Sequence, residues 1–125
     1  MKNIVYFIED DPELINLMKM KLNDNITTIR CFENFHEALE CLKNAKVDEF
    51  PKVIFSDFML PKGDGVDFLM DLRKFYSNKV LPFYFLTAVN RNLIEALVEK
   101  KNYESILNKP IKFEEIFSIL KLITG

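Results

Sequence analysis

Several residue types are scarce in this 125-residue chain, which has no tryptophan, one histidine, two cysteines and three glycines. The single histidine, His36, leaves no imidazole cluster for a transition metal, and we expect it on a helix surface. Cys31 and Cys41 have no Cys or His at ligand spacing, so we expect free thiols, as in a reducing cytoplasm. The few glycines and five prolines exclude a low-complexity chain.

Long hydrophobic runs and a strong charge of either sign are also missing. The longest apolar stretches, such as residues 80–88, are far shorter than the roughly 20 residues of a membrane helix. The first residues do not resemble a signal peptide, and we expect a soluble cytoplasmic protein. The net charge is −2, and the 17 basic residues are spread along the chain. We therefore expect no direct nucleic-acid binding and no membrane binding by this chain.

Apolar runs alternate with amphipathic stretches from one end of the chain to the other. Each run is a candidate strand, and each stretch after it has the spacing of a helix. Strands that alternate with helices predict a parallel sheet with helices on both faces. We therefore expect one α/β domain over residues 1–125, with five β–α units. The five expected strands cover residues 4–8, 26–32, 53–55, 80–86 and 105–107.

Polar side chains gather where these strands end. Glu9 and Asp10 follow the first strand, Asp57 the third, Thr87 the fourth and Lys109 the fifth. Ligands of open α/β sheets bind at this edge, where the carboxyl ends of the strands meet. Each residue alone has an ordinary explanation, such as a turn or a surface charge. Their joint placement points to a site.

The residue types at this edge favour phosphoryl chemistry with a hard metal ion. Two carboxylates about 4 Å apart repel by roughly 4 kcal/mol at an effective dielectric constant of 20, so a cluster of them favours a cation. Oxygen ligands without His or Cys favour Mg²⁺ where phosphate must enter. Asp57 is a competent nucleophile for an aspartyl phosphate. Thr87 can donate a hydrogen bond to a phosphoryl oxygen, and Lys109 can offset its charge.

These motifs resemble those of response-regulator receiver domains over the whole chain. Asp57-Phe58-Met59-Leu60-Pro61, followed by Asp64-Gly65, is similar to the family's phosphoacceptor loop. Glu9-Asp10 resembles its acidic pair, and Thr87-Ala88 and Lys109-Pro110 resemble the steps that end its fourth and fifth strands. The resemblance implies a flavodoxin-like doubly wound sheet with strand order 2-1-3-4-5.

The resemblance also implies a role for each of these residues. Asp57 would be the phosphoacceptor and a Mg²⁺ ligand. Asp10 would bind the metal directly, Glu9 through water, and Met59 through its backbone carbonyl. Thr87 and Lys109 would hold the phosphoryl group, and the Lys109–Pro110 peptide bond would be cis.

A two-component signalling switch is the function that the resemblance implies. A sensor histidine kinase or a phosphotransfer protein would supply the phosphoryl group. Phosphorylation would then alter binding of a protein target, or of a second copy, at the fourth helix and fifth strand. Such a domain is not an enzyme in the usual sense, but it promotes its own phosphorylation and dephosphorylation.

Three positions depart from the family pattern. Ile106 stands where the family usually has a tyrosine or phenylalanine that swings inward, so a ring rotamer at this position cannot report phosphorylation. Tyr103, earlier in the chain, is a candidate substitute. Met59 and Val89 occupy positions that tune phosphate loss in the family. Both are apolar and cannot position an attacking water, so we expect slow dephosphorylation.

Two other functions remain open from the sequence. One is a degenerate receiver that serves as a phosphorylation-independent docking scaffold, and Ile106 is its best support. The other is a haloacid-dehalogenase-like phosphatase, which also uses a strand-end aspartate, Mg²⁺ and a lysine. That class carries a second aspartate two residues after the nucleophile, where this chain has Met59.

Overall fold

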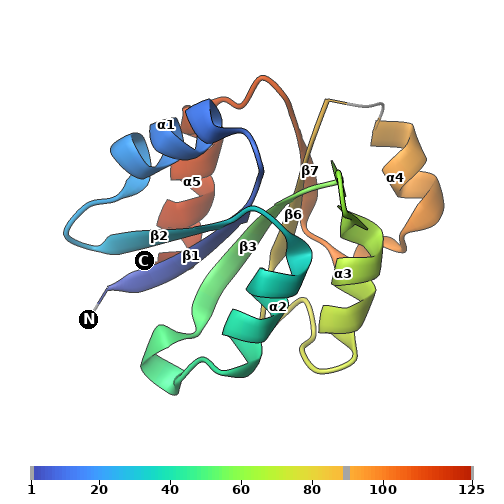
Figure 1. Cartoon of the computed structure of the whole chain (residues 1–125), viewed down its shortest axis with the longest axis horizontal. Helices are drawn as coiled ribbons and strands as arrows, with labels where there is room; N and C mark the ends of the chain where they lie inside the picture. Colours follow the sequence, from blue (N-terminus) through green and yellow to red (C-terminus); the bar gives the residue numbers. More distant parts are fainter. Residues whose placement is uncertain (1, 89–90, 125) are drawn as a thin grey trace.

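A five-stranded parallel sheet forms the centre of the molecule (Figure 1). The computed structural model describes residues 2–88 and 91–124. The strand order is β2-β1-β3-β6-β7, and all neighbouring strands run parallel. This order is the predicted 2-1-3-4-5 when the five long strands are counted along the chain. The strands are β1 (Asn3–Ile8), β2 (Thr27–Phe32), β3 (Pro51–Asp57), β6 (Phe83–Thr87) and β7 (Ser105–Asn108).

Helices cover both faces of the sheet. Within the described residues, α1 and α5 lie on one face, and α2, α3 and α4 lie on the other (Figure 1). A short antiparallel hairpin, β4 (Met59–Leu60) and β5 (Gly63–Asp64), follows β3. The helices are α1 (Pro12–Leu22), α2 (Phe35–Lys43), α3 (Gly65–Arg73), α4 (Arg91–Leu97) and α5 (Phe113–Thr124), with 3₁₀ turns η1 (Val47–Glu49) and η2 (Lys100–Asn102).

Side-chain caps fix where three of these helices begin. Asp11 precedes α1, Asn34 precedes α2, and Asp64 precedes α3. Each of these side chains accepts a hydrogen bond from a backbone N–H in the first turn of its helix. Such caps satisfy donors that have no partner within the helix. As a result, α1 starts three residues after Glu9, and α3 starts directly after the hairpin.

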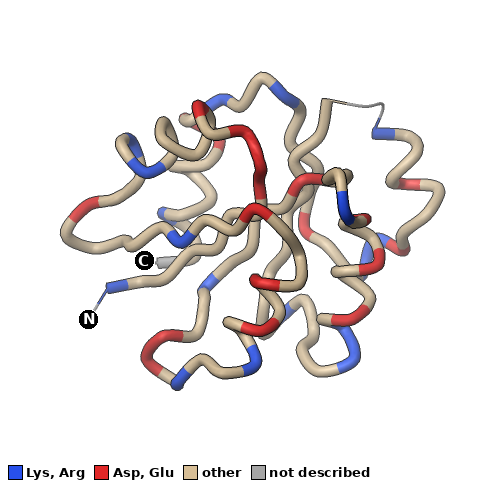
Figure 2. The backbone as a smooth tube through the Cα atoms, viewed as in Figure 1, with Lys and Arg blue, Asp and Glu red and all other residues tan. Residues whose placement is uncertain are grey.

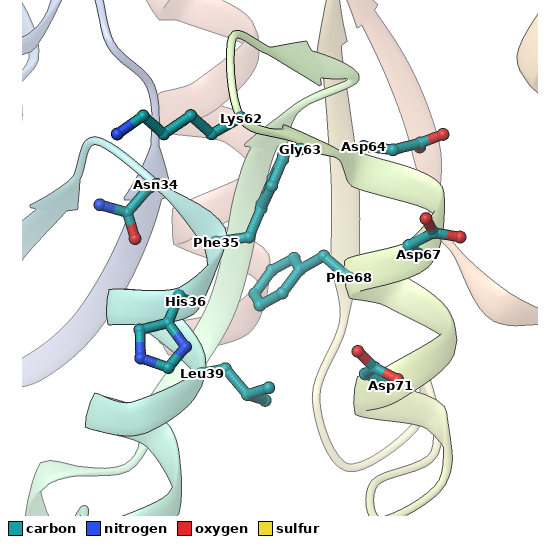
Figure 3. Close-up of a pocket in the computed structure, with 10 residues that line it drawn as sticks. All are labelled: Asn34, Phe35, His36, Leu39, Lys62, Gly63, Asp64, Asp67, Phe68 and Asp71. Carbon is teal, nitrogen blue, oxygen red and sulfur yellow. The ribbon is translucent and has the colours of Figure 1, made fainter.

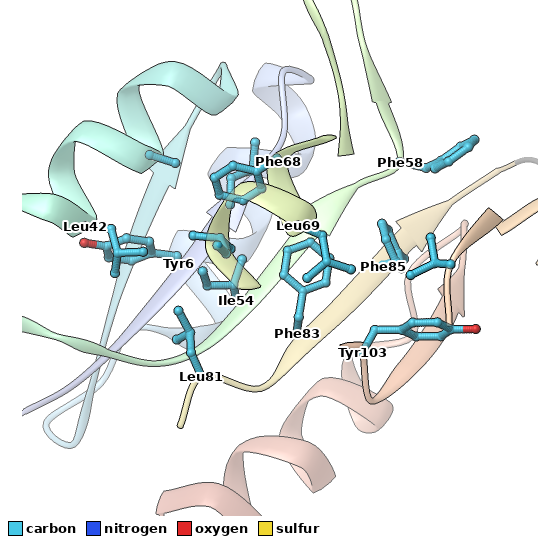
Figure 4. Packing of buried hydrophobic residues seen from close by; sticks show 14 of the residues in the cluster. Tyr6, Leu42, Ile54, Phe58, Phe68, Leu69, Leu81, Phe83, Phe85 and Tyr103 are labelled. Carbon is cyan, nitrogen blue, oxygen red and sulfur yellow. The ribbon is translucent and has the colours of Figure 1, made fainter. Parts of the chain in front are cut away.

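The central strands are buried over most of their length because both of their faces are covered. In β1, residues 4–8 are all buried, and the same holds for residues 53–57 of β3. Two separate apolar clusters result, one on each side of the sheet. Figure 4 shows the cluster beneath α2, α3 and α4, where phenylalanine rings from β6 fill the space under α3. The phenylalanines in this cluster are packing residues.

The predicted bounds of the fourth long strand are wrong at its start. The sequence predicts a strand over residues 80–86, but β6 covers Phe83–Thr87. Val80 is 61% exposed in a turn, while Leu81 is fully buried without being in a strand. Pro82 separates both residues from the strand, and a proline cannot donate to a ladder of backbone hydrogen bonds.

The parallel register brings the ends of four strands to one edge of the sheet. Ile8 of β1 lies opposite Ser56 of β3, and Thr87 of β6 lies opposite Asn108 of β7. The residues that follow these positions are therefore neighbours in space, although they are up to 100 residues apart in the sequence.

Candidate functional site

Three carboxylates meet at this edge of the sheet. Glu9 and Asp10 follow β1, and Asp57 is the last residue of β3. One carboxylate oxygen from each lies within 4.8 Å of the others. Glu9 and Asp57 are almost fully buried, whereas Asp10 is exposed to solvent. Figure 2 shows the acidic run that leads from β1 toward α1. Donors that are all oxygen fit a hard divalent cation, which agrees with the Mg²⁺ expected from the sequence.

Lys109 joins two of these carboxylates. Its Nζ lies 2.7 Å from Asp57 Oδ1, and 3.1 and 2.9 Å from the two oxygens of Glu9. Its own backbone N–H donates to the carbonyl of Thr87 at 2.8 Å, which ties the end of β7 to the end of β6. The peptide bond to Pro110 is cis, as the resemblance implies. Because these charge-assisted bonds are short, they fix the ammonium directly beside the Asp57 carboxylate.

Burial and neighbouring groups perturb the protonation of Asp57 and Lys109. The pKa of Asp57 is raised from 3.8 to about 8, first by burial and then by hydrogen bonding with Glu9, against the opposing effect of Lys109. Burial alone would lower the pKa of Lys109, but hydrogen bonds to Asp57 and Glu9 outweigh it and raise that pKa. One positive charge therefore faces two buried carboxylates, and a second cation would relieve the remaining repulsion.

A cavity of about 230 Å³ opens over Asp57. Thr87 is buried at its side, while the side chain of Met59 is 58% exposed in β4. Of the residues predicted from the sequence, Glu9 lies outside this lining and is held beneath it by Lys109. Val89 lies outside the described residues. The cavity is lined by Asp10, Asp57, Phe58, Met59, Leu86, Thr87, Ala88 and Lys109.

Gly65, to which sequence reasoning assigned no separate role, supports the backbone of the site. It begins α3, and its N–H donates to the carbonyl of Phe58 at 2.7 Å. A Cβ at this position would lie 2.5 Å from the carbonyl oxygen of Asp57 and 2.9 Å from that of Phe58. A side chain here would therefore displace the backbone that carries the Asp57 carboxylate.

We expect Gly65→Ala to lower the free energy of unfolding by about 1–3 kcal/mol, because the added methyl meets backbone atoms that cannot turn aside. Gly63→Ala is the matched control. A Cβ there would lie 2.6 Å from Phe35 Cδ2, which belongs to a half-buried side chain that can rotate. Urea unfolding of both variants measures the difference. Equal losses of stability in the two variants would contradict the role assigned to Gly65.

The structure also shows where four other residues considered from the sequence lie. Asp11 caps α1, and its backbone N–H lies 3.4 Å from Glu9 Oε1, so it helps to hold Glu9. His36 is exposed on α2, as expected. Cys31 and Cys41 are free thiols. No helix in the described part of the chain is long and apolar enough to cross a bilayer.

Ile106 and Tyr103 are both buried in the cluster under α4. The Tyr103 ring packs edge-on against Phe85, with ring centroids 5.5 Å apart. Phe85 in turn faces Phe58 at 6.3 Å, and Phe58 follows Asp57 directly. Figure 4 shows Phe58, Phe85 and Tyr103 on the same side of the sheet. An aromatic ring is thus present near the position where Ile106 lacks one, in contact with a strand of the site.

Comparison with known proteins identifies a matching family. The family model described as "Response regulator receiver domain" matches residues 5–121. Among curated proteins, an uncharacterised 14.6 kDa protein of Leptolyngbya boryana is 26% identical, with 94% of this chain and 86% of that protein covered. The transcriptional regulatory protein TrcR of Mycobacterium tuberculosis is 30% identical, with 94% of this chain covered. The chain spans 43% of the length of TrcR.

Solved structures agree with the fold. The receiver domain of the Francisella response regulator 1452 superposes with a TM-score of 0.77 at 25% identity, covering 98% of this chain and 97% of that one. The chemotaxis response regulator CheY4 of Vibrio cholerae superposes with a TM-score of 0.80 at 20% identity, covering 98% and 99%. The likeness to CheY4 shows the shared fold.

Proposed function

Because the chain belongs to the response regulator receiver domain family, we propose that it is a signalling switch that accepts a phosphoryl group on Asp57 in a Mg²⁺-dependent reaction. Receiver domains of two-component response regulators are phosphoacceptors rather than classical enzymes, and they interact with histidine kinases or phosphotransfer proteins. Our proposal assigns these properties to particular residues of this chain.

One observation carries the proposal: a buried carboxylate at the floor of an open cavity is paired with an ammonium. Asp57 Oδ1 lies 2.7 Å from Lys109 Nζ, and Glu9 and Asp10 supply further oxygen atoms within 4.8 Å. A carboxylate alone would repel a phosphoryl donor. The ammonium and a cation bound by the carboxylates together reverse the sign of the local field.

The proposed reaction transfers the phosphoryl group from a phosphohistidine to Asp57. An Asp57 carboxylate oxygen attacks phosphorus, the bond from phosphorus to the donor nitrogen breaks, and the electron pair leaves with the imidazole. Lys109 then pairs with a phosphoryl oxygen, and the hydroxyl of Thr87 donates to another. Bound Mg²⁺ would neutralise charge on the phosphoryl oxygens, held by Asp10, Asp57 and the backbone carbonyl of Met59, with Glu9 acting through water.

Mg²⁺ is expected to stabilise the folded protein, because binding to the native state alone shifts the folding equilibrium. At a free concentration 100-fold above its Kd, the gain is about 2.7 kcal/mol. Thermal unfolding with Mg²⁺ and with EDTA measures it. Asp10→Asn should remove most of the gain, whereas Asp48→Asn, at an exposed acid in η1, should leave it unchanged. An equal gain in both variants would show that the ion binds elsewhere.

The apolar residue at position 59 is expected to make dephosphorylation slow. Because the Met59 side chain is 58% exposed, Met59→Asn should be tolerated by the fold, and its amide can position an attacking water. Met59→Asn and Val89→Glu, alone and together, should therefore shorten the lifetime of the aspartyl phosphate. The decay of the phosphorylated form, followed over time with the donor removed, measures this. An unchanged or longer lifetime in these variants would contradict the assignment.

We place the output of the switch at the surface of α4 and β7, where a protein target or a second copy would bind. Contacts among Phe58, Phe85 and Tyr103 support a path from the site toward this surface. The two free thiols and a kinase donor both suit a cytoplasmic location. Tyr103→Leu should then weaken the effect of phosphorylation on target binding, with phosphorylation itself unchanged.

A phosphodonor assay separates the proposal from its two rivals. With acetyl phosphate and Mg²⁺, a switch should consume about one equivalent in a burst and then turn over slowly. No consumption would favour a docking scaffold, for which the absence of a ring at Ile106 is the specific support. Steady turnover of p-nitrophenyl phosphate would instead indicate a phosphatase.

A further inference from the structure

A groove lies between α2 and α3, beneath the β4–β5 hairpin (Figure 3). Its volume of about 560 Å³ lies within the usual range of binding pockets, roughly 300–1,000 Å³. The groove is separate from the cavity over Asp57, and neither the chemistry proposed above nor the α4–β7 surface uses it.

The floor of the groove is apolar and partly open to solvent. Phe35 of α2 and Phe68 of α3 stack with centroids 5.2 Å apart, and Figure 3 shows their rings facing one another with Leu39 beside them. Phe68 is buried, but Phe35 and Leu39 are only partly covered. An apolar side chain of a partner placed on this floor would cover the exposed parts of both residues.

The α3 side of the groove is acidic. Asp64, Asp67 and Asp71 line it, whereas Lys62 and His36 are the basic side chains on its lining. Asp64 is occupied as the cap of α3. Asp71 pairs with Lys74 at 3.2 Å, but both side chains are largely exposed, and such a pair contributes little. Asp67 and Asp71 therefore remain open to a cation brought by a partner.

The groove also adjoins the proposed phosphorylation site. Gly63 of the hairpin lies flush against Phe35, since a Cβ there would be 2.6 Å from Phe35 Cδ2. A smaller cavity of about 220 Å³ shares Phe35 and Lys62 with the groove and extends to Asp10. A molecule in the groove would thus lie beside the loop that follows Asp57.

We propose that the α2–α3 groove is a second docking surface, which binds a cationic peptide segment of a protein partner. An aliphatic or aromatic side chain of that segment rests on Phe35, Leu39 and Phe68. Lysine or arginine residues on either side of it face Asp67 and Asp71. The charge of the groove selects the cationic peptide, and its apolar floor selects the apolar anchor. Docking here does not require phosphorylation of Asp57.

Short synthetic peptides test this proposal on the unphosphorylated full chain. The probe is the blocked hexapeptide KKLFKK, with KKSSKK as the control without an anchor and EELFEE as the control of opposite charge. Amide chemical shifts in ¹⁵N spectra report where each peptide binds. We expect KKLFKK to shift residues of α2, α3 and the hairpin in a saturable manner, and the two control peptides to bind at least tenfold more weakly.

Variants separate the groove from general attraction to acidic surface. Asp67→Asn with Asp71→Asn should weaken KKLFKK binding at least fivefold. Glu114→Gln with Glu115→Gln removes the same charge from exposed positions of α5 and should leave binding within twofold. Leu39→Ala should weaken the binding of KKLFKK but not that of KKSSKK. Thermal unfolding of the Leu39→Ala variant shows whether it is folded.

Three results would overturn the proposal. The first is a set of amide chemical-shift changes spread evenly over acidic residues, with an equal loss of affinity for KKLFKK in both charge variants. The second is saturable binding of benzylamine as tight as that of KKLFKK, which would indicate a small-molecule ligand. The third is a concentration-dependent dimer whose interface is this groove, as judged by sedimentation and by the same amide shifts.

Discussion

Replacing Lys109 with methionine is expected to lower the free energy of unfolding by about 3–5 kcal/mol at pH 9 without Mg²⁺, where Asp57 is ionised in the wild type, as when a buried ion pair loses one partner. Methionine keeps most of the volume but removes the charge. Glu9 and Asp57, which are 1% and 5% exposed, would then face one another without a compensating cation. The loss should be smaller near pH 5, where Asp57 is protonated because its pKa is raised to about 8.

Lys112→Met is the matched control for this variant. Lys112 is an exposed lysine shortly before α5, and such surface changes usually alter stability by no more than about 0.5 kcal/mol. Chemical unfolding at pH 5 and pH 9 compares the two variants with the wild type. Mg²⁺ should restore part of the stability of Lys109→Met, because it supplies another cation. A Lys109→Met protein as stable as the control would mean that the ion pairs at this site contribute nothing.

Asp57→Asn is expected to raise stability at pH 8 by up to about 5 kcal/mol in the absence of Mg²⁺, since the pKa of Asp57 rises from 3.8 to about 8 and each pKa unit is worth about 1.4 kcal/mol. Burial is the main reason that the pKa of Asp57 rises to about 8. The folded-state pKa is thus above the ordinary value of 3.8. The unfolded chain loses this proton more readily than the folded one.

The stability of the folded protein should fall as pH rises. For a carboxyl whose folded-state pKa is raised, stability is greatest below the ordinary pKa and falls as pH rises toward the folded-state value. Wild-type stability should therefore decline between about pH 4 and pH 8 through this group. Thermal unfolding across this interval should show that Asp57→Asn lacks most of the decline and that the two proteins converge at the acidic end. A parallel decline in both proteins would contradict the pKa assigned to Asp57.

The fold could be predicted from the sequence because burial on both faces leaves a clear pattern. The strand at 4–8 is apolar at every position. Such a continuous apolar run is typical of a central strand that is covered on both faces of a parallel sheet. The start of the fourth strand could not be read in the same way. Val80 and Leu81 are apolar, but Val80 is exposed in a turn and Leu81 is buried outside the strand, and Pro82 interrupts the ladder.

The location of the site could be predicted from the sequence, but the side-chain contacts within it could not. Strand ends are adjacent in any parallel sheet, so Glu9, Asp57 and Lys109 were expected at one edge. Nothing in the sequence indicates that Lys109 contacts both carboxylates or that Glu9 is nearly fully buried, because these depend on side-chain packing. The β4–β5 hairpin was missed for a related reason, since strands of two residues have no periodicity.

The roles of individual residues remain predictions that the geometry supports. Asp10, Thr87 and Met59 line one cavity together with Asp57. The readout differs from the usual pattern at Ile106, and Tyr103 supplies a ring nearby. Chemistry and readout can therefore be tested separately, through Asp57 and through Tyr103.

Intact-mass measurement after incubation with acetyl phosphate tests the central claim most directly. Wild type and Asp57→Asn are compared side by side, each with Mg²⁺ and with EDTA. We expect a gain of a single phosphoryl group in the wild type with Mg²⁺ and no gain in the other three samples. A phosphoryl group gained by Asp57→Asn, or one gained equally with and without Mg²⁺, would contradict it.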